Sequence, residues 1–220
     1  KSNKDKKIIL NKFHKHKIIF CGDLGYQLPP VEGYEFNSDG LKIIKHTKNH
    51  RCQCEKLHKI LKRMRILIDR DFIDIEAKTL LKKYKFKIHK KEDIDYKVED
   101  LIIAKTHKSK DYYTEKYKDL PKDSVKKKSG DYSCNEIIIG PPPKYLVKEN
   151  TRDYSNGEIV IGEKPDDVKC QVQHAFTIHS IQGETASNTL FIDINRMNCV
   201  RMLYTALSRA KLFSQIKIIE

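Results

Sequence analysis

Short apolar runs alternate with segments of helical spacing along most of this chain, and that alternation restricts the fold more than any other feature. The runs with strand character lie at residues 17–21, 101–104, 158–161, 168–174, 190–193 and 216–219. Apolar residues recur every three or four positions over 54–69 and from Val200 to Leu207, and a further helix is expected over 71–83. Strands that alternate with helices favour a parallel sheet flanked by helices. The sequence therefore predicts an α/β fold.

Residues 105–135 break this alternation. They are rich in Lys, Asp and Tyr without a clear period, and Gly140 with three following prolines marks the exit from the segment. One interpretation is that Tyr112, Tyr113 and Tyr117, which lie among lysines, stack on bases. The other is a partly disordered insertion, which the composition favours. We therefore expect an insertion or mobile loop here.

Composition bounds the partners and the compartment. The formal net charge of +14 favours a polyanionic partner, because Lys and Arg release counterions from phosphates. A solvated lysine-rich surface is the alternative, and since only eight of the 44 basic residues are Arg, the lysine excess can also reflect an A+T-rich genome. No apolar run approaches the roughly 20 residues of a membrane helix, and the charged first residues do not match a secretory signal. The six cysteines lack the spacing of small disulfide-rich secreted domains, so we expect reduced thiols. Together these features predict no membrane partner and an intracellular location, in the cytoplasm, the nucleus or a viral factory.

Three segments carry a known set of motifs in the correct order and spacing. They are IIFCGDLGYQLPPV at 18–31, AFTIHSIQGET at 175–185 and RMLYTALSRAK at 201–211. They resemble motifs III, V and VI of superfamily 1 helicases, most closely the RecD-like 5′-to-3′ branch. TKNHR at 47–51 is similar, more weakly, to motif IV. The resemblance covers most of the chain apart from about residues 105–140.

The resemblance implies an architecture and an activity. Residues 46–220 would form a RecA-like parallel α/β domain with an insertion near 105–140, and residues 1–45 would form the end of a preceding RecA-like domain and a linker. The implied activity is ATP-driven translocation on single-stranded DNA and unwinding of duplex. This chain would supply the mobile second lobe of that machine.

The first and third motifs carry the residues assigned to catalysis. A strand that ends at Gly22 places Asp23 and Gln27 at a sheet edge where α/β folds bind ligands. In the resembled family the glutamine senses the γ-phosphate, and the alternative is a capped surface turn. Arg209 is expected late on an amphipathic helix, away from its apolar stripe, and by resemblance is the arginine finger. The alternative is an ordinary surface arginine.

The remaining assignments concern nucleotide and strand binding. Arg51, Gly183 and Gln182 are assigned to nucleotide binding by resemblance, although Arg51 can equally be a surface charge at the start of a helix. Gln182 is also placed at the strand groove. Hydroxyl groups and a histidine after a strand suit the backbone of a single strand, and we assign them to nucleic-acid binding: Thr177, His179, Ser180 and Thr185. A histidine at a strand end can instead be purely structural.

Two motifs that an ATPase needs are absent from the sequence. A P-loop requires Gly-x-x-x-x-Gly-Lys-Ser/Thr, and the similar spacing from Gly157 to Gly162 is followed by Glu163-Lys164, which does not fit. No acidic Mg²⁺-binding pair precedes residue 17 either. Because the chain also lacks an initial Met, we expect part of a longer protein, inactive alone, with ATP and Mg²⁺ held mainly by another domain.

A cluster of possible metal ligands lies at the start of the helix over 54–69. Cys-x-Cys followed by x₃-His is not a standard zinc spacing, so no metal site is predicted at the cluster of His50, Cys52, Cys54 and His58.

Two rival functions stay open. One is a viral superfamily 1 RNA helicase, which would make RNA the strand. The other is a non-catalytic nucleic-acid-binding module derived from a helicase, against which the presence of Gln27, Gln182 and Arg209 argues.

Overall fold

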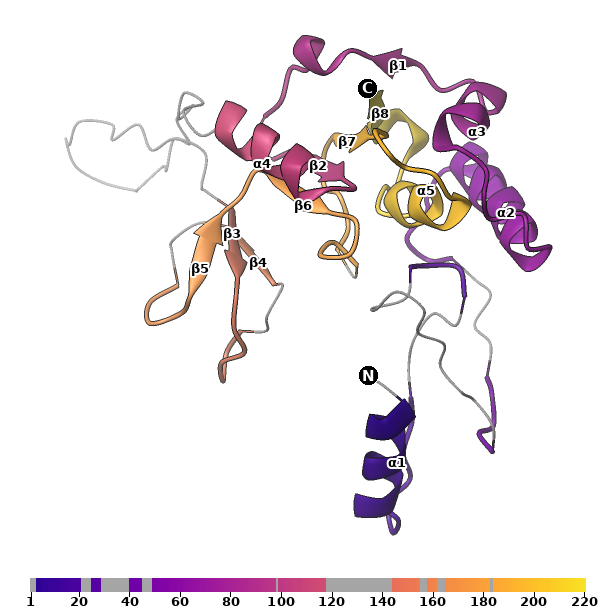
Figure 1. The fold of residues 1–220 in the computed structure, drawn as a ribbon, viewed down its shortest axis with the longest axis vertical. Helices are drawn as coiled ribbons and strands as arrows, with labels where there is room; N and C mark the ends of the chain where they lie inside the picture. The colour runs from indigo at the N-terminus through magenta and orange to yellow at the C-terminus, as the bar shows by residue number, and fades with distance from the viewer. Residues whose placement is uncertain are drawn as a thin grey trace, which may run out of the picture.

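A five-stranded parallel sheet forms the centre of the computed structural model (Figure 1). The structure describes residues 3–20, 25–28, 40–44, 49–97, 99–117, 144–154, 158–161, 165–182 and 184–220. The strand order is β1-β8-β7-β2-β6, and every neighbouring pair is parallel. The strands are β1 Ile88–His89, β2 Leu101–Ala104, β6 Ala175–Thr177, β7 Leu190–Asp193 and β8 Ile216–Ile219. The predicted α/β fold with a parallel sheet is confirmed.

The two faces of this sheet pack into two separate cores. Leu101 and Ile103 of β2 face a large core that also contains the apolar sides of three helices, α2 Glu55–Asp69, α3 Ala77–Lys83 and α5 Val200–Leu207. Ile102 points to the opposite face, because successive side chains alternate along a strand. There it packs with Tyr113 of the helix α4 His107–Lys116. The sheet is therefore covered on both sides.

The helix α2 forms as its spacing predicts. Its buried side chains recur at helical intervals and are Leu57, Ile60, Leu61, Met64 and Ile68. Burying each such side chain contributes about 1.5–3 kcal/mol. The next helix is shorter than expected over 71–83, because Asp71 has a positive φ of 60° that ends the turn and α3 begins only at Ala77.

Residues 107–116 correct the expectation of a loop over 105–135. They form α4, which begins after the cap Thr106, whose hydroxyl accepts a hydrogen bond from Ser109 N at 3.1 Å. The side chain of Tyr113 is fully buried and its hydroxyl donates to Asp193 Oδ2 at 3.1 Å. A tyrosine held in this way anchors a helix to the sheet and does not serve as a base-stacking surface. Residues 118–143 lie outside the described part of the chain.

A second, antiparallel sheet follows in the order β4-β3-β5, built from β3 Lys144–Val147, β4 Ile159–Ile161 and β5 Cys170–Val172. The single strand expected over 168–174 is therefore wrong. The chain breaks at Gln173 and His174, so that β5 belongs to this sheet and β6 to the parallel one.

The N-terminal residues differ most from expectation. A helix, α1 Asn3–Lys12, precedes a stretch without regular structure over 17–20, where a buried strand was predicted. Ile19 is 76% exposed. A strand needs a neighbour for its hydrogen bonds, and no described strand pairs with this stretch. Figure 1 shows α1 set apart from both sheets. No helix in the described ranges is both long and apolar enough to span a bilayer.

Candidate functional site

Arg51 joins residues from three of the predicted motifs. Its Nε donates a hydrogen bond to the hydroxyl of Thr185 at 2.8 Å, and its Nη1 donates to the carbonyl of Ser208 at 3.0 Å. The side chain of Asn49 accepts from the main-chain N–H groups of Arg51 at 3.0 Å and Cys52 at 3.2 Å. This turn fixes the backbone that presents the guanidinium. The candidate motifs IV, V and VI therefore meet at one side chain.

The guanidinium of Arg51 is half-buried. Burial lowers its pKa from the ordinary value, while the nearby Tyr204 and Glu184 act in the opposite direction. A guanidinium nonetheless stays charged in proteins. Its planar fork can contact two oxygens of a phosphate at once. The position combines a fixed orientation with a charge that suits an anionic ligand.

Arg209 lies inside the protein and not on a helix surface. The helix α5 ends at Leu207, and the whole Arg209 residue is 0% exposed. Its Nε donates to Thr205 O at 3.1 Å, its Nη2 to Ser208 Oγ at 2.8 Å and its Nη1 to Glu184 O at 3.3 Å. The expected position away from the apolar stripe of a continuing helix is therefore corrected, because the chain turns at Ser208 and directs the side chain inward.

The segment that contains Gln27 packs against the same region. Gln182 Nε2 donates to the carbonyl of Leu28 at 2.9 Å, and Leu28 N donates to the hydroxyl of Thr205 at 3.3 Å. Gln27 is half-buried beside these contacts. The candidate motif III thus touches the candidate motifs V and VI. Sequence reasoning predicted Gln182 as a site residue but gave no signal that it binds main chain 154 positions away.

An aromatic clamp, which comprises Tyr26, Arg65 and Tyr204, holds that segment against α2 and α5. The Arg65 guanidinium lies 5.0 Å from the ring centre of Tyr26 and 5.5 Å from that of Tyr204. Its Nε also donates to the hydroxyl of Tyr204 at 2.7 Å, and the hydroxyl of Tyr26 donates to Asp69 at 3.2 Å. Sequence analysis missed Arg65, which lies in no motif and is one of several cations on α2.

The turn after β6 carries most of the residues assigned to strand binding. The hydroxyl of Thr177 donates to that of Ser180 at 3.1 Å, which in turn donates to Thr177 O at 3.0 Å. These two hydroxyls therefore brace the turn. His179 and Thr185 are exposed and so are the accessible members of the set. The turn starts at the carboxyl end of a parallel strand, where α/β folds place ligands.

Two predicted site residues have no described position. Asp23 and Gly183 lie outside the residues that the structure describes. Within the described ranges, no group of three or more His, Cys, Asp or Glu side chains is arranged to hold a metal ion. Near the start of α2, the Cys52 thiol contacts Cys54 O at 3.2 Å.

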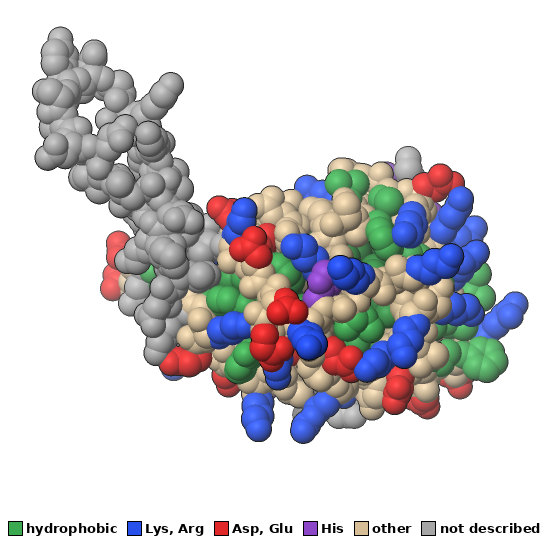
Figure 2. All heavy atoms as spheres, turned by 90° about the horizontal axis from the view of Figure 1, so that it is seen from above, with side chains coloured by type: hydrophobic (Ala, Val, Ile, Leu, Met, Phe, Trp, Pro, Cys, Tyr) green, Lys and Arg blue, Asp and Glu red, His purple; other side chains and the backbone are tan. Residues whose placement is uncertain are grey.

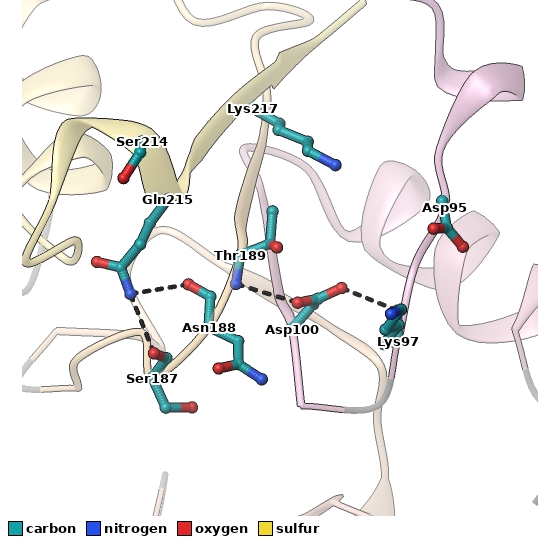
Figure 3. A pocket seen from close by; sticks show the side chains of 9 residues that line it. All are labelled: Asp95, Lys97, Asp100, Ser187, Asn188, Thr189, Ser214, Gln215 and Lys217. Carbon is teal, nitrogen blue, oxygen red and sulfur yellow. Dashed lines mark hydrogen bonds between the residues drawn. The ribbon is translucent and has the colours of Figure 1, made fainter. Parts of the chain in front are cut away.

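A hollow at another place in the fold contains none of these residues (Figure 3). It has a volume of about 410 Å³ and is lined by Asp95, Lys97, Asp100, Ser187, Asn188, Thr189, Ser214, Gln215 and Lys217. Asp100 accepts from Thr189 N at 3.0 Å and from Lys97 N at 2.9 Å, which ties together the residues that precede β2 and β7. These contacts mark the amino edge of the sheet, opposite to the edge where α/β folds bind ligands.

Solved structures of helicases resemble this fold. A structure that addresses DNA unwinding at forked double-stranded DNA by two coordinating Pif1 helicases is 18% identical, with a TM-score of 0.54 over 99% of this chain and 57% of that one. Bacteroides Pif1 bound to single-stranded DNA is 16% identical, with a TM-score of 0.55 over 99% of this chain and 58% of that one. Bacteroides Pif1 with ADP-AlF3 and single-stranded DNA is 16% identical, with a TM-score of 0.54 over 81% and 52%.

The chain has the RecA-like α/β fold. At these low identities the likeness to the Pif1 helicases establishes the fold alone. The chain spans a little over half of the length of these helicases. No protein-family model and no curated protein matches the sequence.

Proposed function

We propose that this chain is the second RecA-like domain of an ATP-dependent superfamily 1 helicase of the RecD-like branch, which translocates on single-stranded DNA and unwinds duplex. The observation that carries the proposal is the position of Arg51, bonded to Thr185 and to Ser208 O. A cation that residues of two other candidate motifs hold in a fixed orientation is suited to position a nucleotide phosphate relative to the strand-binding turn. The Pif1 structures of similar fold contain single-stranded DNA, one of them together with ADP-AlF3, which supports the proposal.

Arg51, Gln182 and Arg209 form the nucleotide side of the proposed site, together with Gly183, Gln27 and Asp23. Arg51 is the best placed to bind a phosphate oxygen, because its charge is oriented by Thr185 and still half-exposed. The P-loop, and with it most of the contact to ATP and Mg²⁺, comes from another domain, since this sequence has none. ATP supplies the free energy, and Mg²⁺ would neutralise phosphate charge.

Thr177, His179, Ser180 and Thr185 form the strand side. His179 and Thr185 are exposed and can contact the strand directly, while the hydroxyls of Thr177 and Ser180 hold the turn in shape. Thr185 also accepts from Arg51, so one hydroxyl touches both halves of the site. A shift of Arg51 on nucleotide binding would thereby reach the strand through a single hydrogen bond.

The burial of Arg209 favours a second candidate. An arginine finger has to reach nucleotide across a cleft, but this guanidinium is enclosed and satisfied by Thr205 O, Glu184 O and Ser208 Oγ. In that arrangement Arg209 serves as a structural tie between α5 and the segment after β6. A nucleic-acid-binding module without ATP turnover is the function consistent with such a role.

One experiment separates the two functions. In the whole protein that joins this chain to a P-loop domain, Arg209→Lys and Arg51→Gln are each compared with wild type for nucleotide affinity, kcat and the free energy of unfolding. Loss of kcat by a factor of about 10³ or more for Arg209→Lys, with unfolding unchanged, supports the finger. A large loss of stability for Arg209→Lys, with kcat of the folded fraction within about threefold of wild type, contradicts the finger and favours the binding module.

A further inference from the structure

A basic groove lies between α2 and α3, outside the proposed helicase site. We define it by the residues that line it, Lys56, Lys59, Ile60, Arg63, Lys83, Tyr84 and Lys85. Its volume is about 220 Å³, several times the roughly 30 Å³ that one water occupies in the liquid. The groove is formed by residues 56–63 of α2, by the last residue of α3 and by the two residues that follow α3. None of the residues assigned to nucleotide or strand binding lines it.

The charge of the basic groove is of one sign. Five of its seven lining residues are cations, all five are exposed, and none of the described residues that line it is acidic. The nearest carboxylate in sequence is Glu55, which pairs with Lys59 at 2.7 Å, but both side chains are largely exposed and such pairs contribute little. On the right of Figure 2, the side where Figure 1 places α2 and α3, Lys and Arg side chains gather.

Apart from Glu55, the acidic residues of α2 and of its connection to α3 lie at the other end of α2. They are Asp69, Asp71, Asp74 and Glu76. Helix pairs that are merely solvated mix both signs along their surface. Here the pair of Glu55 with Lys59 is the exception, and the five cations that line the groove repel one another across it. That repulsion is relieved when an anion binds between them.

The floor of the basic groove is ordered. Ile60 and Tyr84 are 5% and 8% exposed, and both belong to the large core. The ammonium of Lys56 lies 3.5 Å from the ring centre of Phe213, which restrains that lysine at the rim. Four of the five cations project from packed helices, and Lys85 lies in the turn after α3. Because the helices restrict these side chains, less side-chain entropy is lost when they bind a ligand.

We infer that the basic groove binds the phosphate backbone of duplex nucleic acid. Duplex DNA carries one charge per about 1.7 Å of its axis, twice the density of either strand alone, so a surface that contacts phosphates only gains most from a duplex. Single strands gain affinity from stacking on exposed aromatic rings, and the one aromatic residue that lines the groove, Tyr84, is buried. The site goes beyond the proposed function, because it requires neither ATP nor the strand-binding turn.

The test compares two triple variants of the full chain with equal charge changes. Lys59→Gln, Arg63→Gln and Lys83→Gln remove cations of the basic groove. Lys97→Gln, Lys108→Gln and Lys169→Gln remove three exposed lysines elsewhere. Affinity for a labelled 20-base-pair duplex is measured from low to moderate salt. The groove variant should flatten the slope of log K against log salt by about 0.9 for each phosphate that the groove no longer neutralises, and we expect roughly two to three such phosphates. It should also weaken duplex binding at least about tenfold at about 50 mM salt.

The inference is overturned if the control variant weakens duplex binding as much, or if the groove variant weakens a 20-nucleotide thymidine strand by the same factor. A separate His179→Ala, Thr185→Ala variant tests the strand site, and should weaken the single strand while leaving the duplex slope as in wild type. Reductive methylation of the wild-type chain gives an independent result. Added duplex should protect Lys56, Lys59, Lys83 and Lys85, and unchanged labelling of all four lysines contradicts the groove.

Discussion

Arg51 and Thr185 are 134 positions apart, and a hydrogen bond of 2.8 Å joins the guanidinium of one to the hydroxyl of the other. Arg51 precedes α2, while Thr185 follows the turn after β6. The hydrogen bond therefore links two segments that are far apart in the sequence. The same guanidinium reaches Ser208 O after α5. A ligand that displaces Arg51 would therefore break its hydrogen bonds to both Thr185 and Ser208.

The coupling between Arg51 and Thr185 can be measured. Arg51→Gln and Thr185→Val, alone and together, should show a coupling in the free energy of unfolding on the order of 1 kcal/mol, because each single change removes the same charge-assisted bond. Urea titration of the four proteins gives the number. Thr79→Val, at an exposed threonine on α3, is the control and should add independently to Arg51→Gln. If the changes in the free energy of unfolding caused by Arg51→Gln and Thr185→Val simply add, the hydrogen bond between the two residues does not contribute to stability.

The chain by itself should not hydrolyse ATP. No segment of the sequence can form a P-loop, whose main-chain N–H groups and lysine hold the phosphates. Steady-state hydrolysis is measured with and without single-stranded DNA, and the Arg51→Gln variant reports any contaminating activity. DNA-stimulated turnover that the variant abolishes would refute the proposed division of the site between two domains.

The aromatic clamp should control how firmly residues 25–28 are held. Arg65→Met keeps most of the side-chain length but removes the contact with both rings and the bond to Tyr204. The expected cost is about 1–2 kcal/mol. Hydrogen exchange of the peptide containing Tyr26 should accelerate more than that of α5. Arg63→Met, a neighbouring exposed position, is the matched control. Equal exchange in both variants would show that Tyr26 is held by something else.

The spacing of apolar residues in the sequence predicted the helices and strands that bury a regular set of apolar side chains. The spacing of Leu57, Met64 and Ile68 identified α2, and the apolar run at 101–104 identified β2, because both elements bury one continuous set of side chains. The same reasoning missed α4, whose attachment depends on a tyrosine hydroxyl bonded to Asp193 and on a capping threonine. These contacts leave no apolar period in the sequence.

The candidate site was predicted as a set of residues but not as a geometry. Motif order indicated that the segments of Arg51, Gln182 and Arg209 belong together. In the structure Arg51 and Arg209 both bond Ser208, and they reach the segment that follows Gln182 at Thr185 and Glu184. The burial of Arg209 was not foreseeable, because it depends on α5 ending two residues before it. Whether a side chain turns inward after a helix is decided by long-range carbonyls, here Glu184 O.

The last prediction concerns Lys144, which is the first residue of β3 and is 5% exposed. Its Nζ donates to Asp100 O. Burial lowers the pKa of Lys144 to about 8, while Asp100 and Glu99 act in the opposite direction. An unfolded lysine has a pKa of about 10.4. Between these values the unfolded chain binds a proton that the folded chain does not, so the free energy of unfolding rises with pH.

The predicted gain between about pH 8 and 10 is on the order of 2 kcal/mol, since one pKa unit corresponds to about 1.4 kcal/mol. Burial raises the pKa values of Tyr96, Tyr113 and Tyr117, which lowers stability once unfolded tyrosines ionise near pH 10. Urea titrations are therefore compared between pH 7.5 and 9.5. Wild type should gain stability over this window relative to Lys144→Met, whereas Lys169→Met, at an exposed lysine, should follow wild type. If Lys144→Met keeps the wild-type pH slope, Lys144 is protonated in the folded chain throughout and the cost of its burial is offset by its neighbours.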